Sequence, residues 1–315
     1  MRRAAIALCS LATIWAAAAL WFDFPVSWLC WLLAPGYLVF AAAVGRKRIG
    51  IWAGSLALIV VWWLSLKPNE NRNWQPYAAR VPWAEIEGYR AVIHNIRNCD
   101  YVTETNYTPH WEIKTVQLSD IRGVDLFLSH WGMDWIGHAI VSFEFADGSH
   151  LATSIEARKT VGQEYSAIPG FFRQFQTMYL IAEERDVVRV RTNYRGESVY
   201  LYRTMTTPGD ALGLFRHYLE WMNQARERPE WYNAVTANCA TNFVRYLAEA
   251  KVGDISRWDW RTLFVGEADE LLYKKGDLMT DGLPFAELKR RALIRPTPDV
   301  NFSHQIRLNR PGFTQ

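Results

Sequence analysis

The sequence contains little cysteine, only four residues among 315. Cys9 and Cys30 lie inside long apolar runs, where cysteine behaves as a small apolar residue. Only Cys99 and Cys239 are therefore available for chemistry or for a disulfide bond in the rest of the chain. A Cys99–Cys239 bond stays open as an alternative, because an oxidising compartment would permit it.

A basic excess is also missing from most of the chain. The sequence has 35 Lys and Arg and 32 Asp and Glu residues, and five of the basic ones but only one acidic one fall within residues 1–66. From residue 67 onward, 30 basic residues stand against 31 acidic ones. Because this part has no basic excess and no recognised binding motif, we exclude nucleic acid as a partner. Internal repeats and low-complexity stretches are absent from the sequence too.

Long apolar runs fill the N-terminal part instead. Residues 4–22, 25–44 and 51–66 each come close to the ~20 residues that cross a bilayer as a helix. Seven of the 16 tryptophans lie here, several near the ends of the runs, where indole rings prefer the membrane interface. The pattern predicts three transmembrane helices in residues 1–66, with a cleaved signal peptide as the alternative for the first run.

Charges beside these runs predict their orientation. A basic pair precedes the first run and a basic triplet at residues 46–48 follows the second, whereas the first connection has no basic residue. Since basic flanks stay in the cytoplasm, three crossings place everything after residue 66 outside it. In a Gram-negative bacterium that side is the periplasm. We therefore predict a multi-pass protein of the bacterial inner membrane, with a linker at residues 67–80 and a periplasmic domain at residues 81–315.

Strand patterns come first in the outer domain, and helix patterns follow. Strands are expected at residues 111–118, 138–145, 150–155, 186–191 and 199–203. Helices are expected at residues 207–229, 238–253 and 283–293. The turn signal Asp147-Gly148 would join the second and third strands as a hairpin. This order predicts an α+β domain with an antiparallel sheet.

Cys239 has the features of a reactive thiol. Asn238 is a good N-cap, so Cys239 would lie in the first turn of the helix that follows. There the helix dipole and the unpaired backbone N–H groups favour the thiolate. His138 and His150 lie in the predicted hairpin and could act as base and orienting group. The set predicts nucleophilic catalysis by a cysteine.

Polar residues beside the histidines could complete a site. Ser154, Glu156 and Arg158 alternate along the second strand of the hairpin and share a face with His150. That face is either a polar wall beside the catalytic histidine or a solvated ion pair, and both interpretations stay open here. The residues that we expect to contact substrate are Asn238, Tyr232, Glu156 and Arg158.

A metal site has little support in the sequence. His130, His138, His150 and Cys239 offer metal-binding atoms, but their spacings match no compact ligand pair. We therefore expect neither a metal nor another cofactor.

The order of these residues resembles the permuted papain-like enzymes, the lecithin:retinol acyltransferase and NlpC-type group. Eleven residues separate His138 from His150, and Asn238-Cys239 opens a helix with Phe243-Val244 after it. In that group the histidine strand precedes the cysteine helix. The resemblance implies a permuted papain-like fold in which His138 is the base, His150 orients it and Cys239 forms a thioester.

A second resemblance covers nearly all of residues 85–295. The segments that carry it occur in order: Arg97-Asn98-Cys99-Asp100-Tyr101, Gly137-His138, Ser154-Ile155-Glu156-Ala157-Arg158, Gly170-Phe171-Phe172-Arg173-Gln174, Glu184-Arg185-Asp186, Val199-Tyr200-Leu201-Tyr202, Trp231-Tyr232-Asn233 and Asn238-Cys239. They resemble the Lnb N-terminal periplasmic domain family. The resemblance implies a lipoprotein N-acyltransferase, which moves a fatty acyl chain from phospholipid to the amino group of a lipid-modified N-terminal cysteine. Its partners would be phospholipid, a lipoprotein or another envelope substrate, and the membrane.

Three functions follow from these patterns. The first is a membrane-anchored, periplasmic thiol acyltransferase that works through a Cys239 thioester. The alternative is a cysteine hydrolase of the cell envelope, either an amidase or peptidase or a phospholipase, using the same residues. The third is a membrane-tethered binding module without catalysis, in which Cys239 is bonded to Cys99.

Overall fold

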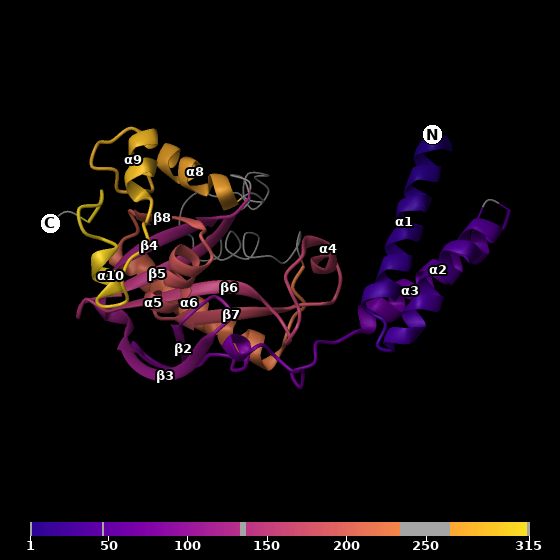
Figure 1. The fold of residues 1–315 in the computed structure, drawn as a ribbon, viewed down its shortest axis with the longest axis horizontal. Helices are drawn as coiled ribbons and strands as arrows, with labels where there is room; N and C mark the ends of the chain where they lie inside the picture. The colour runs from indigo at the N-terminus through magenta and orange to yellow at the C-terminus, as the bar shows by residue number, and fades with distance from the viewer. Residues whose placement is uncertain (1, 46, 133–136, 234–264, 314–315) are drawn as a thin grey trace. The chain divides into compact units, whose positions relative to one another are not determined.

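The computed structural model describes residues 2–45, 47–132, 137–233 and 265–313 (Figure 1). Asn238 and Cys239, with the helix expected after them, lie outside the described residues. The chain forms two compact units. The helical unit consists of residues 1–71, 164–176 and 230–234, and the sheet unit of residues 72–163, 177–229 and 235–315.

Three apolar helices make up most of the helical unit: α1 (Arg2–Phe22), α2 (Ser27–Val44) and α3 (Ile49–Ser65). By length and composition α1 and α2 can cross a membrane, whereas α3 has 17 residues and is shorter than a typical span. The structure thus shows two of the three expected spans by length and composition, and the third is not shown. Basic residues before α3 and Lys67 after it limit the apolar stretch.

Tryptophan side chains join α3 to α1. Trp63 donates from Nε1 to Asp23 Oδ2 at 2.7 Å, and Trp52 donates from Nε1 to Thr13 Oγ1 at 3.0 Å. The Trp63 ring also meets Trp15 edge to face at 5.3 Å. These contacts fix the shorter helix against the first one.

An eight-stranded sheet is the centre of the sheet unit, as far as the chain is described. Its strands are β1 (Trp83–Glu87), β2 (Arg90–Tyr101), β3 (Tyr107–Gln117), β4 (Ile121–His130), β5 (Gly137–Phe145), β6 (His150–Arg158), β7 (Gln176–Ala182) and β8 (Ser198–Arg203). They lie in the order β1-β2-β7-β6-β5-β4-β8, and β3 pairs with β2. The expected α+β class is confirmed.

The remaining described elements are short helical turns and three longer helices. The turns are η1 (Pro76–Ala78), η2 (Leu118–Asp120), α4 (Ala167–Gly170), α5 (Glu184–Val187), η3 (Val190–Tyr194), η5 (Val265–Glu267) and α10 (Phe302–Gln305). Beyond the apolar helices, the longer ones are α6 (Pro208–Glu227), α8 (Ala268–Lys275) and α9 (Phe285–Ala292). Thr207 caps α6 by accepting from the Asp210 N–H, as its sequence predicts.

The expectation of an antiparallel sheet is wrong at one place, because β2 and β7 pair in parallel through Arg97 and Ala182. The sheet is therefore mixed. A hairpin turn forces neighbouring strands to run antiparallel, but β2 and β7 are far apart in sequence and no such turn joins them.

The β5–β6 hairpin has the predicted form. Ile140 pairs with Ser154, and Glu144 pairs with His150, in antiparallel register. Gly148 takes a φ of 77° in the turn, a conformation that glycine adopts without a steric penalty. The Ser149 N–H donates to Asp147 Oδ1 at 2.9 Å and stabilises the turn.

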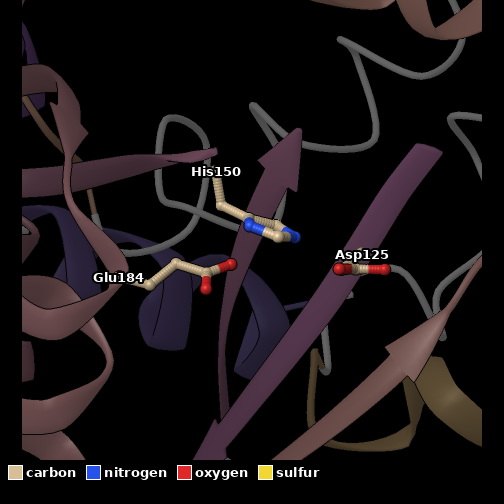
Figure 2. A group of neighbouring side chains, drawn as sticks. All are labelled: Asp125, His150 and Glu184. Atoms are coloured by element: carbon tan, nitrogen blue, oxygen red, sulfur yellow. The ribbon is translucent and has the colours of Figure 1, made fainter. Parts of the chain in front are cut away.

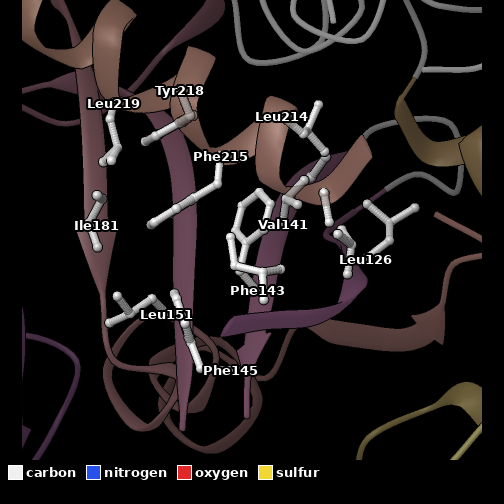
Figure 3. Packing of buried hydrophobic residues seen from close by; sticks show 14 of the residues in the cluster. Leu126, Val141, Phe143, Phe145, Leu151, Ile181, Leu214, Phe215, Tyr218 and Leu219 are labelled. Atoms are coloured by element: carbon white, nitrogen blue, oxygen red, sulfur yellow. The ribbon is translucent and has the colours of Figure 1, made fainter. Parts of the chain in front are cut away.

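Both faces of the central strands are buried, each under a different set of elements. On the α6 face, Phe143 and Leu151 pack against Phe215 and Leu219 of α6 (Figure 3). On the opposite side, named here the α5 face, the strands pack against α5 and the C-terminal part of the chain. The residues of that cluster include Phe127, Ile140, Ala152, Val187 of α5 and Phe302 of α10.

The strand expected at residues 186–191 is wrong, since this segment forms α5 and the turn η3. Its alternating valines suggest a strand, but tertiary contacts decide otherwise. The fully buried Asp186 accepts two hydrogen bonds from Arg97 and one from the Cys99 N–H. A helical turn at this point brings Asp186 to β2 and buries Val187 and Val188.

We expect Phe215→Ala to lower the free energy of unfolding by about 3–5 kcal/mol, because the cavity would open in the fully buried core under α6. Thermal and denaturant unfolding in detergent measures this. Glu220→Ala, at a half-exposed position of the same helix, is the control and should change stability little. Equal effects of both substitutions would contradict the packing described.

Candidate functional site

Two buried polar groups lie on the α5 face, with Phe127, Ile140 and Ala152 between them. Side chains alternate along a strand, so His138 and Ser142 share the face of Ile140 on β5. On β6, the same rule puts His150, Ser154 and Glu156 on the face of Ala152. The alternation expected from the sequence therefore places all of these polar side chains on one side of the sheet.

The first group is built around His138 at the start of β5. The imidazole is 6% exposed, and its Nε2 lies 2.7 Å from Ser154 Oγ. The Ser154 hydroxyl donates to Glu156 Oε1 at 3.2 Å, and that oxygen lies 3.8 Å from His138 Nε2. A histidine, a hydroxyl and a carboxylate thus form one hydrogen-bonded series.

This series assigns the tautomer of His138. Because Ser154 uses its proton toward Glu156, its oxygen is left to accept from the imidazole. Nε2 of His138 then carries the proton, and Nδ1 is the basic nitrogen of the ring. The assignment comes from the hydrogen-bond network, as it does for any histidine without observed hydrogens.

Arginine stabilises the carboxylates of this group. Arg191 of η3 donates to Glu156 Oε1 at 3.3 Å and to Glu197 Oε2 at 3.0 Å. The Ser129 hydroxyl also donates to Glu197. Burial alone would raise the pKa of Glu156, but the positive charge of Arg191, followed by that of Arg97, lowers it to about 2. Glu156 is therefore ionised at neutral pH.

His138 is neutral at the same pH. Burial, and then the charge of Arg191, lower the pKa of His138 from 6.5 to about 4, although Glu156 acts in the opposite direction. A neutral imidazole with a fixed tautomer can accept a proton at Nδ1. The geometry and the charges therefore fit a general base.

Gly137 lets another element approach this histidine. A Cβ at Gly137 would lie 3.0 Å from the backbone nitrogen of Gly266 and 3.1 Å from its Cα. Only a glycine therefore leaves room for η5 beside the first residue of β5. Gly137 and Gly266, which are far apart in the sequence, thus set the spacing between the backbones of β5 and η5 next to His138.

The second group, at the other end of β6, contains His150, Asp125 and Glu184. Figure 2 shows the His150 ring between the two carboxylates, and one possible ligand atom from each residue lies within 4.8 Å of the other two. Glu156 comes six positions after His150, roughly 20 Å along an extended strand. The structure therefore does not bring His150 to His138, which the orienting role expected for it would require.

Arg307 joins the two carboxylates of the second group. It donates to Asp125 Oδ2 at 2.6 Å and to Glu184 Oε1 at 2.6 Å. Arg203 lies 2.9 Å from the other oxygen of Asp125, and Ser142 donates to Glu184 at 2.5 Å. Burial would raise the pKa of Glu184, but the charge of Arg307 lowers it to about 2.

This second group does not fit a metal ion, although its composition suggests one. Asp125, His150 and Glu184 are the residues that could hold a cation within the described ranges. The carboxylates, however, already form ion pairs with two guanidinium groups, those of Arg307 and Arg203. A divalent cation would have to displace Arg307 and stand beside Arg203, at the cost of like-charge repulsion. We read the group as a buried ion-pair network.

The other expected site residues have different surroundings. Arg158 is 3% exposed, donates to Ala78 O at 3.0 Å and stacks over Trp74 at 4.1 Å. Its contacts hold the chain before β1. Tyr232 belongs to the helical unit, where its backbone N–H donates to Phe175 O at 3.0 Å. Of the substrate-contacting residues expected from the sequence, Glu156 is the described one that lies beside His138.

The described cysteines are free thiols, Cys99 among them. Cys99 is fully buried, and burial raises its pKa to about 12. A thiol that is held protonated in this way reacts slowly with disulfides and oxidants. These properties argue against the binding-module alternative, which needs Cys99 in a disulfide bond.

Several members of both groups escape sequence reasoning. Asp125 had a usable signal, since a carboxylate within the apolar run of β4 must be paired if it is buried. Glu197 and Ser129 carry no comparable signal, and Arg307 lies far along the chain from both of its partners. The structure pairs Arg191 with two carboxylates.

With this geometry in place, comparison with known families identifies the class of protein. The model of the Lnb N-terminal periplasmic domain family matches residues 107–266, just over half of the chain. The chain belongs to that family. The match includes His138, Ser154 and Glu156, and together with α1 and α2 it defines a membrane-anchored protein with a periplasmic domain. No curated protein and no solved structure gave a significant match.

We expect the thermal stability of the protein to fall as the pH drops from about 6.5 to 4. The pKa of His138 is about 4 in the folded protein and near 6.5 in an unfolded chain, so the unfolded state binds the proton first. The full loss corresponds to roughly 3 kcal/mol. Burial lowers the pKa of His150 as well, in the same direction. Melting curves from pH 7.5 to 4 should fall less steeply for His138→Gln, whereas the exposed control His217→Gln should follow the wild type.

Because Arg307 neutralises the second group, dialysis against a chelator should leave the melting temperature unchanged. Arg307→Met should lower the free energy of unfolding by about 3–5 kcal/mol, since two buried carboxylates lose their partner. Arg290→Met, at an exposed ion pair on α9, is the matched control. A chelator-induced loss of stability that zinc or calcium restores would show that our interpretation of this group is wrong.

Proposed function

We propose that this protein is a membrane-anchored, periplasmic thiol acyltransferase with Cys239 as nucleophile and His138 as base. The observation that carries the proposal is the state of His138: it is buried, neutral, and has its tautomer set by Ser154 and Glu156. An unactivated thiol needs such a base to become nucleophilic at neutral pH. The pattern at residues 238–239, a capped helix start, supports the choice of nucleophile.

The proposed reaction has two halves. In the first, His138 Nδ1 takes the thiol proton of Cys239, the thiolate attacks an ester carbonyl of a phospholipid, and the acyl chain passes to sulfur. The lyso-lipid alkoxide leaves with the proton from His138. In the second, an acceptor amine attacks the thioester while His138 takes its proton. The acyl chain passes to nitrogen, and that proton returns to the sulfur.

Glu156 takes the orienting role that the sequence assigned to His150. While Cys239 is deprotonated, His138 is an imidazolium, and the carboxylate at 3.8 Å stabilises this charge through Ser154. His150 lies beside Asp125 and Glu184 at the other end of β6, away from His138, so we assign it a structural contribution. Backbone N–H groups at the start of the Cys239 helix would stabilise the oxyanion of each tetrahedral intermediate.

Fold and anchor also support the proposal. The antiparallel β5–β6 hairpin carries the histidine ahead of the cysteine in the chain, the order of a permuted papain-like domain. Membrane-crossing helices keep the domain near lipid and raise the effective concentration of an acyl donor. Asn238 and Tyr232 stay in the proposal as substrate contacts.

Full-length protein in proteoliposomes, with acyl-labelled phospholipid and a lipid-modified peptide bearing a free N-terminus, tests the proposal. Cys239→Ser should give no thioester, and His138→Gln should lower the transfer rate by about 10²–10⁴-fold. Glu156→Gln should lower the rate and shift its pH profile. His150→Gln should lower the melting temperature but keep most of the activity of the folded fraction.

The products of the same assay decide between the two enzyme classes. Label on the peptide amine supports the transferase, and label released as free fatty acid supports the hydrolase alternative. Wild-type transfer rates in Cys239→Ser would overturn both. Loss of transfer in His150→Gln, at unchanged stability, would show that His150 orients His138 in place of Glu156.

A further inference from the structure

The apolar side chains of residues 164–176, in the helical unit, fall into a buried set and an exposed set. Phe172 and Phe175 are buried within the unit, 6% and 0% exposed. Ile168 in α4, Phe171 and Tyr165 are 62%, 44% and 43% exposed. Three large apolar side chains within seven residues are therefore exposed beside two buried phenylalanines, which singles the segment out as an interaction surface.

Hydrogen bonds attach this segment to the ends of the apolar helices. The Arg173 N–H donates to Asp23 Oδ1 at 3.0 Å, next to the last residue of α1. Gln174 Nε2 donates to Phe22 O at 2.6 Å, and Arg173 Nη1 donates to Leu66 O at 2.7 Å, just after α3. The segment is thus held by backbone groups where two apolar helices end.

Aromatic contacts strengthen the attachment. Phe172 stacks on Phe22 with ring centroids 5.0 Å apart, and the Arg173 guanidinium lies 4.2 Å from the centre of the Trp63 ring. Because Phe172 is buried in this contact, Phe171 beside it points outward. Of these two neighbouring phenylalanines, Phe172 thus packs against the helix ends and Phe171 is exposed.

The position of these helix ends identifies what surrounds the exposed side chains. α1 begins with Arg2 and Arg3, and Lys47 and Arg48 follow α2 at the same end of the antiparallel α1–α2 pair. Phe22 and Leu66 are at the other end, which basic-flank orientation assigns to the periplasmic side. A segment bound to Phe22 and Leu66 stands at the outer membrane–water boundary, where aromatic and aliphatic side chains are favoured.

We propose that residues 165–171 dip into the outer leaflet of the same bilayer that α1 and α2 cross. Ile168 and Phe171 lie among the upper acyl carbons, and Tyr165 lies at headgroup level. The partner is the lipid surface, because the segment is hydrogen-bonded to the ends of the apolar helices at Phe22 and Leu66. This contact does not depend on the proposed acyl-transfer chemistry and would hold for any activity of the sheet unit.

Site-specific photocrosslinking tests the contact in the full-length protein. Benzoylphenylalanine replaces Ile168 or Phe171 in proteoliposomes of phosphatidylethanolamine and phosphatidylglycerol, and adducts are mapped by mass spectrometry. The control is Tyr89, an aromatic residue of the sheet unit that is 60% exposed. We expect at least tenfold more phospholipid adduct at 168 and 171 than at 89. Equal adduct at the three positions, or adduct to protein in place of lipid, would overturn the proposal.

A second measurement avoids the introduced probe. A phospholipid with a photoreactive group in its acyl chain should label residues 165–171 of the wild type, and Ile168→Asn/Phe171→Asn should reduce that labelling several-fold. Both side chains are exposed, so the melting temperature in detergent should match the wild type. Unchanged labelling in the folded double variant would count against the lipid contact, whatever the outcome of the activity assay.

Discussion

The pairing of buried carboxylates with arginine is the interaction on which the sheet unit depends. Glu156 meets Arg191, Asp186 meets Arg97, and Asp125 and Glu184 share Arg307. An unpaired buried carboxylate here would cost several kcal/mol, so each one requires an arginine, and the pairs join the sheet to the elements packed against it. The pairs thereby select which elements cover the α5 face: α5, η3 and the segment after α10.

The need to pair each buried carboxylate with arginine divides the α5 face into two regions, one around His138 and one around His150. Near His138, Arg191 pairs with Glu156, and the Ser154 hydroxyl lies between the imidazole and this carboxylate. The three groups form a hydrogen-bonded series that can carry a proton. Near His150 two arginines take up the carboxylates and hold the C-terminal part of the chain to the sheet. Two clusters of similar composition therefore differ in their hydrogen bonding, because the charges are paired in different ways.

Much of the sheet unit could be predicted from local pattern. The β5–β6 hairpin, the start of α6 at Thr207 and the helix near residue 285 follow from turn, cap and periodicity signals that act over a few residues. Residues 186–191 could not be predicted in this way. Their valines favour a strand locally, and the ion pair of Asp186 with Arg97, 89 residues away, overrides that preference.

The sequence by itself determined the apolar N-terminal helices, the α+β class and the place of His138 in the β5–β6 hairpin, because hydropathy, alternation and turn chemistry are local properties. Only the tertiary structure decided which polar residue serves His138. Alternation puts His150 and Glu156 on the same face of β6, so it does not distinguish between them. The register of β6 against β5 brings Glu156 to His138 and places His150 near Arg307. Register depends on pairing between segments, and pairing is a property of the folded sheet rather than of either strand.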